Sequence, residues 1–261
     1  MSRLARAFET ARREDRGALI AYVMAGDPSL EASEAYAIAC ERGGADMLEL
    51  GVPFSDPVAD GPEIQGAAQR ALAAGTTPGR AFDLARKIRR VSEVPIVLMG
   101  YYNPIFSMGD AVFAERAARA GADGLIVPDL PPEEADPLRE GCRNHGLDFV
   151  FLVSPATDGK RARMIAESSS GFVYLVSRYG ITGVSRHLPA GLADRIAEMR
   201  KASRLPVAVG FGISSAESVR SVVRAGAHAA VVGSAIVKRI ADGMPPQGVE
   251  SFLRDLATGL R

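Results

Sequence analysis

The chain has 261 residues, and its 31 Lys and Arg residues balance 31 Asp and Glu residues, so its formal net charge is zero. This balance argues against a nucleic acid or another polyanion as partner. Hydrophobic residues make up 47% of the chain and charged residues 24%, which is ordinary for a globular domain and excludes extensive disorder.

The chain is expected to open with a short amphipathic helix within residues 1–17. This stretch contains three acidic residues and lacks the continuous apolar core of a signal peptide. No later stretch approaches the ~20 uninterrupted apolar residues of a membrane span, which predicts a soluble protein. Cys40 and Cys142 lie in helical patterns without metal-like spacing, which predicts reduced thiols and a cytoplasmic location.

Apolar runs of β-type composition alternate with segments of helical periodicity along the whole chain. The predicted strands are Ala18–Met24, Met47–Val52, Pro95–Met99, Leu125–Val127, Phe149–Val153, Phe172–Val176, Val207–Val209 and Ala229–Val232. The predicted helices are Leu30–Arg42, Ala81–Arg90, Ala111–Ala120, Glu133–Asn144, Arg161–Ser168, Leu192–Ala202 and Ala216–Ala225. Alternation of this kind, with continuous apolar runs, is typical of parallel strands that are buried on both faces.

A weak internal repeat supports one architecture for the chain. Three helical segments end in a glycine-alanine pair that leads into a strand, at residues 42–46, 119–123 and 224–228. Eight such βα units predict an α/β fold of one domain, residues 1–261, in which a (β/α)8 TIM barrel follows the short extra helix. A doubly wound open sheet is the alternative.

Two connections are longer than ordinary loops, Gly51–Pro62 after the second strand and Ser177–Pro189 after the sixth. Both follow the carboxyl ends of strands, where barrels gather their catalytic groups. The first has several prolines, so the stretch from Leu48 to Gln65 is predicted to begin as a strand and to end as a stiff loop.

Two carboxylates in this first stretch are the candidate catalytic residues. Glu49 lies within an apolar run, where a carboxylate is costly to bury, so its pKa is expected to be raised. Asp60 lies eleven residues later in the loop and is expected to stay ionised. The alternatives are a structural glutamate paired with a cation or an amide, and a turn aspartate before glycine. Asp56 ranks third, as a residue that shapes the loop.

The last two βα junctions predict a phosphate site. Each has a strand, a glycine and then the start of a helix, so backbone amides and a helix N-terminus can approach an anion. Gly212, Gly233 and Ser234 form the predicted cradle, with Gly183 as a possible fourth wall. The alternative is two tight turns in which Ser214 or Ser234 is an N-cap.

Aromatic residues stand in or at the ends of four predicted strands: Tyr22, Tyr101, Tyr174 and Phe211. They can line a pocket for a flat apolar ligand, although barrel core is the alternative for each one. Together with the phosphate site they indicate a substrate with one anionic and one aromatic end. The three histidines have no spacing that predicts a metal site.

Five motifs resemble the tryptophan synthase alpha chain family. They are LELGVPFSDPVADGPEIQ at 48–65, PIVLMGYYNPI at 95–105, YLVSRYGITG at 174–183, GFGISS at 210–215 and GSAIVK at 233–238. The resemblance covers nearly the whole length. It implies a TIM-barrel lyase that cleaves indole-3-glycerol phosphate by a retro-aldol step to indole and glyceraldehyde 3-phosphate, in tryptophan biosynthesis.

The resemblance also implies roles for single residues. Glu49 matches the family's general acid and base, and Asp60 matches the anion that stabilises positive charge on the indole nitrogen. The matches to pocket and phosphate positions are Tyr174, Thr182, Gly183, Phe211, Gly212, Gly233 and Ser234. Tyr22 and Tyr101 match positions around the indole. Tyr22 departs from the phenylalanine expected there, and Tyr179 departs from a smaller or variable residue.

By the same resemblance the partner is the tryptophan synthase beta chain in an α2β2 tetramer. Asp56, Pro57, Asn103 and Pro104 match the face that docks on it. The resemblance implies no cofactor in this chain and pyridoxal phosphate in the partner. The alternatives are a stand-alone indole-3-glycerol phosphate lyase, another phosphate-handling barrel such as a sugar-phosphate isomerase, and a non-enzymatic barrel that activates a partner.

Overall fold

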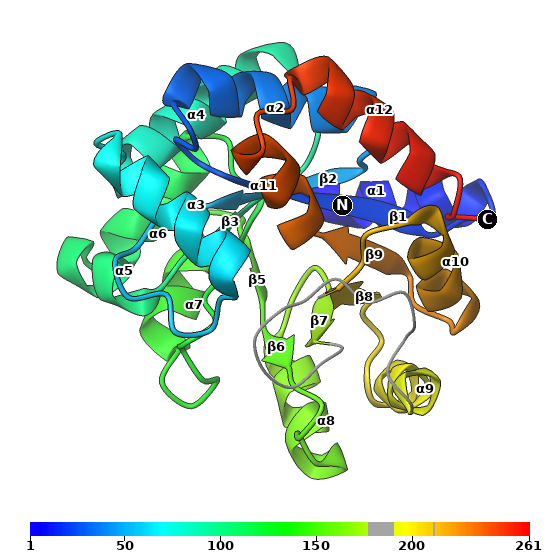
Figure 1. Ribbon diagram of the computed structural model, residues 1–261. Coiled ribbons are helices and arrows are strands. Elements are labelled where there is room, and N and C mark those ends of the chain that lie inside the picture. The colour runs from blue at the N-terminus through cyan, green and yellow to red at the C-terminus, as the bar shows by residue number, and fades with distance from the viewer. Residues whose placement is uncertain (177–190, 211) are drawn as a thin grey trace.

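Parallel strands form a barrel that helices surround on all sides (Figure 1). The computed structural model describes residues 1–176, 191–210 and 212–261. In this part of the chain the strands are β1 Ala18–Met24, β2 Met47–Gly51, β3 Ile96–Met99, β4 Gly124–Ile126, β5 Asp148–Val150, β6 Leu152–Val153, β7 Val173–Val176, β8 Val207–Gly210 and β9 Ala229–Val232. Their order in the sheet is β5-β4-β3-β2-β1-β9-β8-β7-β6.

The two strands at the ends of this order belong to one segment of the chain, which closes the sheet. β5 pairs with β4, β6 pairs with β7, and only Phe151 separates β5 from β6. The carbonyl of Phe151 accepts a hydrogen bond of 3.1 Å from the amide of Tyr174. The predicted strand Phe149–Val153 is therefore divided in two. The eight-fold barrel is confirmed, and the open sheet is wrong.

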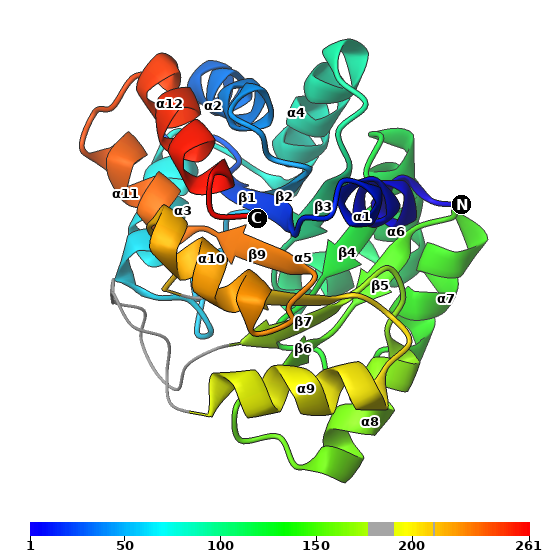
Figure 2. The same ribbon diagram turned by 90° about the vertical axis from the view of Figure 1, so that its right-hand side faces the viewer.

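The described helices are α1 Arg3–Arg13, α2 Leu30–Arg42, α3 Pro62–Ala73, α4 Pro78–Val91, α5 Tyr102–Met108, α6 Asp110–Arg119, α7 Asp136–Asn144, α8 Gly159–Ser168, α9 Leu192–Ala202, α10 Ala216–Arg224, α11 Ser234–Ala241 and α12 Pro246–Ala257. Figure 2 shows them around the strands, with α12, α2 and α4 on one side and α8 and α9 on the other. The leading helix and the seven predicted crossover helices are present.

Three helices were not predicted from the sequence, α3, α5 and α12, whereas the start of α11 was predicted at the last βα junction. The expectation that Leu48–Gln65 ends as a loop is wrong, because Pro62 begins α3. A proline fits at that position since the first helical amide has no partner within the helix. The same reason admits Pro104 in the first turn of α5.

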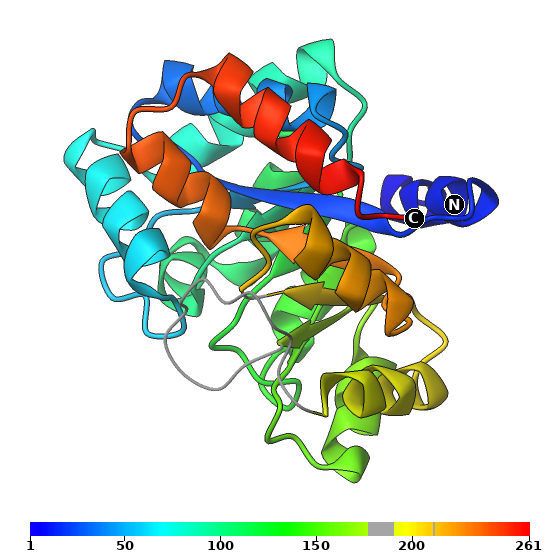
Figure 3. The same ribbon diagram turned by 45° about the vertical axis from the view of Figure 1, so that its right-hand side comes forward.

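Alternation along the strands separates two apolar layers. Leu48 and Leu50 of β2 pack outward against the helices, whereas Met47 belongs to a cluster inside the barrel. Glu49 has the same parity as Met47 and so points inward. Leu4 and Phe8 of α1 join the inner cluster. Helix α1 therefore closes the end of the barrel where the strands begin, away from the segment around residue 60 (Figure 3).

Candidate active site

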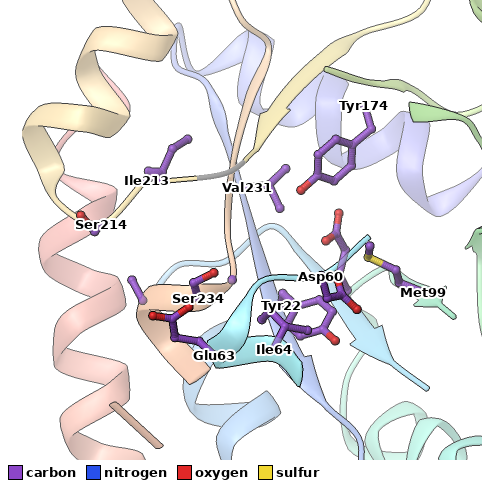
Figure 4. A pocket seen from close by; sticks show the side chains of 14 residues that line it. Tyr22, Asp60, Glu63, Ile64, Met99, Tyr174, Ile213, Ser214, Val231 and Ser234 are labelled. Atoms are coloured by element: carbon purple, nitrogen blue, oxygen red, sulfur yellow. The ribbon is translucent and has the colours of Figure 1, made fainter. Parts of the chain in front are cut away.

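A pocket opens at the carboxyl end of the strands, and Figure 4 shows its lining. It encloses about 620 Å³ of empty space, part of it open to solvent. In Figure 4 one end has Tyr22, Asp60 and Tyr174, and the other has Glu63, Ser214 and Ser234. The described lining residues are Tyr22, Glu49, Asp60, Glu63, Ile64, Met99, Tyr174, Gly212, Ile213, Ser214, Val231, Gly233, Ser234 and Ala235.

Glu49 is a buried carboxyl group, with an exposed fraction of 1%. Its neighbours in the sheet are Tyr22 on β1 and Val97 on β3. Its Oε1 atom has no hydrogen-bond partner among the described residues. Burial raises the pKa of Glu49 from 4.5 to about 8, the direction predicted for a carboxylate in an apolar run. At neutral pH this group is therefore mostly protonated and can give up a proton.

Asp60 lies half-buried in the loop between β2 and α3. Tyr101 donates a hydrogen bond of 3.0 Å from its hydroxyl to Oδ2 of Asp60, and the same hydroxyl accepts one from the amide of Ala59. Burial raises the pKa of Asp60 to about 6, and the bond from Tyr101 opposes the rise. Asp60 is therefore mostly ionised at pH 7, as the sequence predicts for a loop carboxylate.

Two tyrosine rings reach the pocket because glycine faces each of them. A Cβ on Gly51 would lie 2.1 Å from the hydroxyl oxygen of Tyr22, and a Cβ on Gly210 would lie 2.1 Å from that of Tyr174. Burial, followed by the nearby carboxylates, raises the pKa of both tyrosines. The hydroxyl that distinguishes Tyr22 from phenylalanine contacts the sulfur of Met24 at 3.8 Å.

The two predicted phosphate loops differ in how their helices begin. Ser215 caps α10 through a capping box with Ser218, whereas within the described residues no side chain caps α11, whose N-cap is Gly233. Neither Ser214 nor Ser234 is an N-cap, so that part of the tight-turn alternative is wrong, although a serine, Ser215, does cap α10. Gly212 has a φ of 82° and also lines the pocket. The uncapped N-terminus of α11 favours an anion beside Ser234.

Some predicted site residues lie elsewhere. Thr182, Gly183 and Phe211 lie outside the described residues, as does Tyr179. Tyr101 does not line the pocket but reaches it through its bond to Asp60.

The predicted docking residues lie on two neighbouring segments beside the mouth of the barrel. Phe54 stacks on Tyr101 with ring centroids 5.5 Å apart, which joins the loop after β2 to the start of α5. Asp56 and Pro57 belong to that loop, and Asn103 and Pro104 belong to α5.

Sequence reasoning missed seven of the described lining residues: Glu63, Ile64, Met99, Ile213, Ser214, Val231 and Ala235. Glu63 and Ile64 belong to α3, which was expected to be a loop. The run of small apolar residues at Ala67, Ala68 and Ala71 has helical spacing and could have revealed this helix.

No described helix is long and apolar enough to cross a membrane. The described residues also contain no group of three or more His, Cys, Asp or Glu side chains that could bind a metal ion. The cytoplasmic location stays a prediction.

Comparisons with known proteins agree over nearly the whole chain. The family model described as tryptophan synthase alpha chain matches residues 8–258. A tryptophan synthase alpha chain of Methanosarcina mazei is 48% identical over 254 residues, which cover 97% of this chain and 92% of the relative. An alpha chain of Opitutus terrae is 46% identical over 261 residues, which cover 100% of this chain and 98% of the relative. In a tryptophan synthase structure of Mycobacterium tuberculosis, a chain that is 34% identical superimposes with a TM-score of 0.93 over 100% and 98% of the two chains.

Proposed function

The chain belongs to the tryptophan synthase alpha chain family of lyases, which cleave indole-3-glycerol phosphate, and we propose that Glu49 and Asp60 catalyse that cleavage here. The observation that supports this proposal most is Glu49 itself. Its carboxyl group is buried, has an oxygen without a partner among the described residues, and faces a pocket that also contains Asp60. A buried carboxyl group without a partner lowers stability, so its presence in a pocket supports a functional role.

Cleavage breaks the bond between indole C3 and the adjacent hydroxyl-bearing carbon of the glycerol chain. The protonated carboxyl of Glu49 gives its proton to C3 and then takes the proton of that hydroxyl as the aldehyde forms. The electrons of the broken bond return to the indole ring. Glu49 ends the step protonated again, so no net proton is consumed. A pKa of about 8 suits a group that both gives and takes a proton near neutral pH.

Asp60 stabilises the intermediate in which C3 has been protonated. Positive charge then develops on the indole nitrogen, and an ionised carboxylate that accepts the N–H stabilises it. The hydroxyl of Tyr101 binds Oδ2 of Asp60 and so restricts the orientation of the carboxylate. Tyr22 and Tyr174 line the same end of the pocket and fit the flat indole ring.

The phosphate binds at the other end of the pocket. None of the described lining residues is Lys or Arg, so the amides of Gly212, Gly233 and Ser234 and the N-terminus of α11 bind the anion. Thr182, Gly183 and Phe211 keep the roles that the family resemblance implies.

The partner is the tryptophan synthase beta chain, in which pyridoxal phosphate belongs. The docking face includes Asp56, Pro57, Asn103 and Pro104. Two large apolar side chains on the same segments support this assignment, because Val58 is 82% exposed and Phe106 is 71% exposed. Exposed apolar groups beside polar ones are typical of protein–protein contacts.

The experiment measures indole release from indole-3-glycerol phosphate by wild type, Glu49→Gln and Asp60→Asn, each with and without a beta chain. Both variants should lose at least 100-fold in kcat, roughly the loss expected when a general acid or a charge stabiliser is removed. The exposed Glu167→Gln on α8 is the matched control and should keep wild-type activity.

Stimulation of wild type by the beta chain, with co-elution on a sizing column, supports the complex. Equal indole release with and without beta supports the stand-alone lyase instead. Full activity in Glu49→Gln would refute the catalytic assignment.

A further inference from the structure

Glu63 is a pocket residue without a role in the reaction described above. It is the second residue of α3 and stands in the lining beside Ser234, as Figure 4 shows. Its Oε2 atom is buried and has no hydrogen-bond partner among the described residues. A buried carboxylate oxygen of this kind is costly unless a ligand supplies a donor.

Charge decides which part of the substrate can be that donor. Phosphate oxygens accept hydrogen bonds, and a second anion against them is repelled, with no Lys or Arg among the described lining residues to offset it. Glu63 therefore does not bind the phosphate itself. It needs an N–H or O–H group that lies close to the phosphate.

Indole-3-glycerol phosphate has three such groups outside the phosphate. The indole N–H faces Asp60, and the hydroxyl on the carbon next to the indole faces Glu49. The third is the hydroxyl on the middle carbon of the glycerol chain, one carbon from the phosphate ester. It has no partner in the mechanism above, and Glu63 lies at the phosphate end of the pocket.

We propose that Glu63 accepts a hydrogen bond from the middle hydroxyl of the glycerol chain and selects substrates that have it. This inference rests on the proposed phosphate site and extends it with a specificity-determining residue. A site built to bind a hydroxyl discriminates strongly against ligands without it, because the buried acceptor is then left unpaired.

Two ligands that differ only in this hydroxyl test the inference by calorimetry. They are glycerol 3-phosphate and 3-hydroxypropyl phosphate. Wild type should bind glycerol 3-phosphate about 10-fold more tightly, as expected for a hydrogen bond to a charged group. Glu63→Met, of similar length but without an acceptor, should lose this preference. Glu63→Gln, which keeps a neutral acceptor, should retain a preference of a few fold.

Two controls separate the inference from the proposal beneath it. Glu31, the exposed second residue of α2, is the matched control, and Glu31→Met should keep the wild-type ratio. Ser234→Ala should weaken the binding of both ligands alike.

If Glu63→Met keeps the wild-type ratio, or wild type binds both ligands equally, the role of Glu63 is refuted and the phosphate site stands. If wild type binds neither ligand, the phosphate site fails and the inference fails with it.

Discussion

Glu49 shows how a candidate catalytic residue opposes the stability of its own fold. Its apolar neighbours on β2 stabilise the folded state when they leave water. The ionised form of Glu49 destabilises it, because it loses its hydration and gains no hydrogen bond at Oε1 among the described residues. The folded protein reduces this cost by retaining a proton, which is the origin of the raised pKa. The same property that suits the group to proton transfer should therefore be measurable as lost stability.

The first prediction concerns the pH dependence of the free energy of unfolding. The pKa of Glu49 is about 8 in the folded protein and 4.5 in its ordinary state. Between these values the folded protein binds more protons than the unfolded chain, so stability falls as pH rises. Glu49→Gln should remove this loss and exceed wild type at pH 8 by on the order of 2–4 kcal/mol.

Urea unfolding at pH 6 and pH 8 measures this effect. Asp60, with a pKa of about 6, also titrates at the lower end of this interval, but it does so in both proteins, so the difference between them isolates Glu49. A stability difference between Glu49→Gln and wild type that is the same at both pH values would contradict the prediction.

Helix α3 links the loop that contains Asp60 to the rest of the barrel. It begins directly after Asp60 and Gly61, and its first turn places Glu63 and Ile64 in the pocket. Near its other end Arg70 binds Asp27 through two hydrogen bonds, of 2.7 and 2.8 Å. Asp27 is only 2% exposed, so the pair fixes α3 to the segment after β1.

The second prediction is that Arg70→Met destabilises the protein and weakens substrate binding. Asp27 would lose its cation and remain buried, at a cost of about 1–3 kcal/mol, reduced from the fully buried case because Arg70 is 38% exposed. The KM for indole-3-glycerol phosphate should rise several fold more than kcat falls, because α3 positions the pocket and does not perform the chemistry.

Arg86→Met is the matched control for this prediction, since its ion pair with Asp83 on α4 is exposed. It should cost less than about 1 kcal/mol and leave KM unchanged. An Arg70→Met protein with the KM of wild type would show that the pair has no part in positioning α3.

One end of the barrel is expected to serve activity and the other to serve stability. The end at which the strands finish has the pocket, and the opposite end is closed by α1, whose Phe8 lies 5.7 Å from the ring of Phe172. Leu4 of α1 is fully buried in the cluster inside the barrel. Residues at the closed end are therefore expected to affect folding without touching the substrate.

The third prediction follows from this division. Leu4→Ala should lower the free energy of unfolding by about 2–5 kcal/mol, because it leaves a cavity in the core. At temperatures where the variant stays folded, kcat/KM should remain within about two-fold of wild type, as a steady-state assay at 20 °C would measure. Val91→Ala, at a side chain that is 71% exposed, is the control and should change stability by about 0.5 kcal/mol or less. A large fall in kcat/KM of folded Leu4→Ala would contradict the division.

The sequence by itself determined the fold class and the identity of the two candidate catalytic residues. The periodicity of apolar residues in strands and helices is a local property, so the bounds of β1, β9, α2 and α9 agree with the predicted ones at both ends. A carboxylate in an apolar run is also a local signal, which is why Glu49 was found without knowledge of its neighbours.

Only the tertiary structure decided which distant residues meet. Closure of the barrel brings Tyr22, Tyr174 and Ser234 to one pocket, and no local pattern encodes these contacts. The bond from Tyr101 to Asp60 spans 41 residues. Glu63 was missed because the prolines before it indicate a loop, whereas packing of α3 across the mouth stabilises a helix. The physical reason is that propensity acts between neighbours in the chain, whereas burial and charge act between neighbours in space.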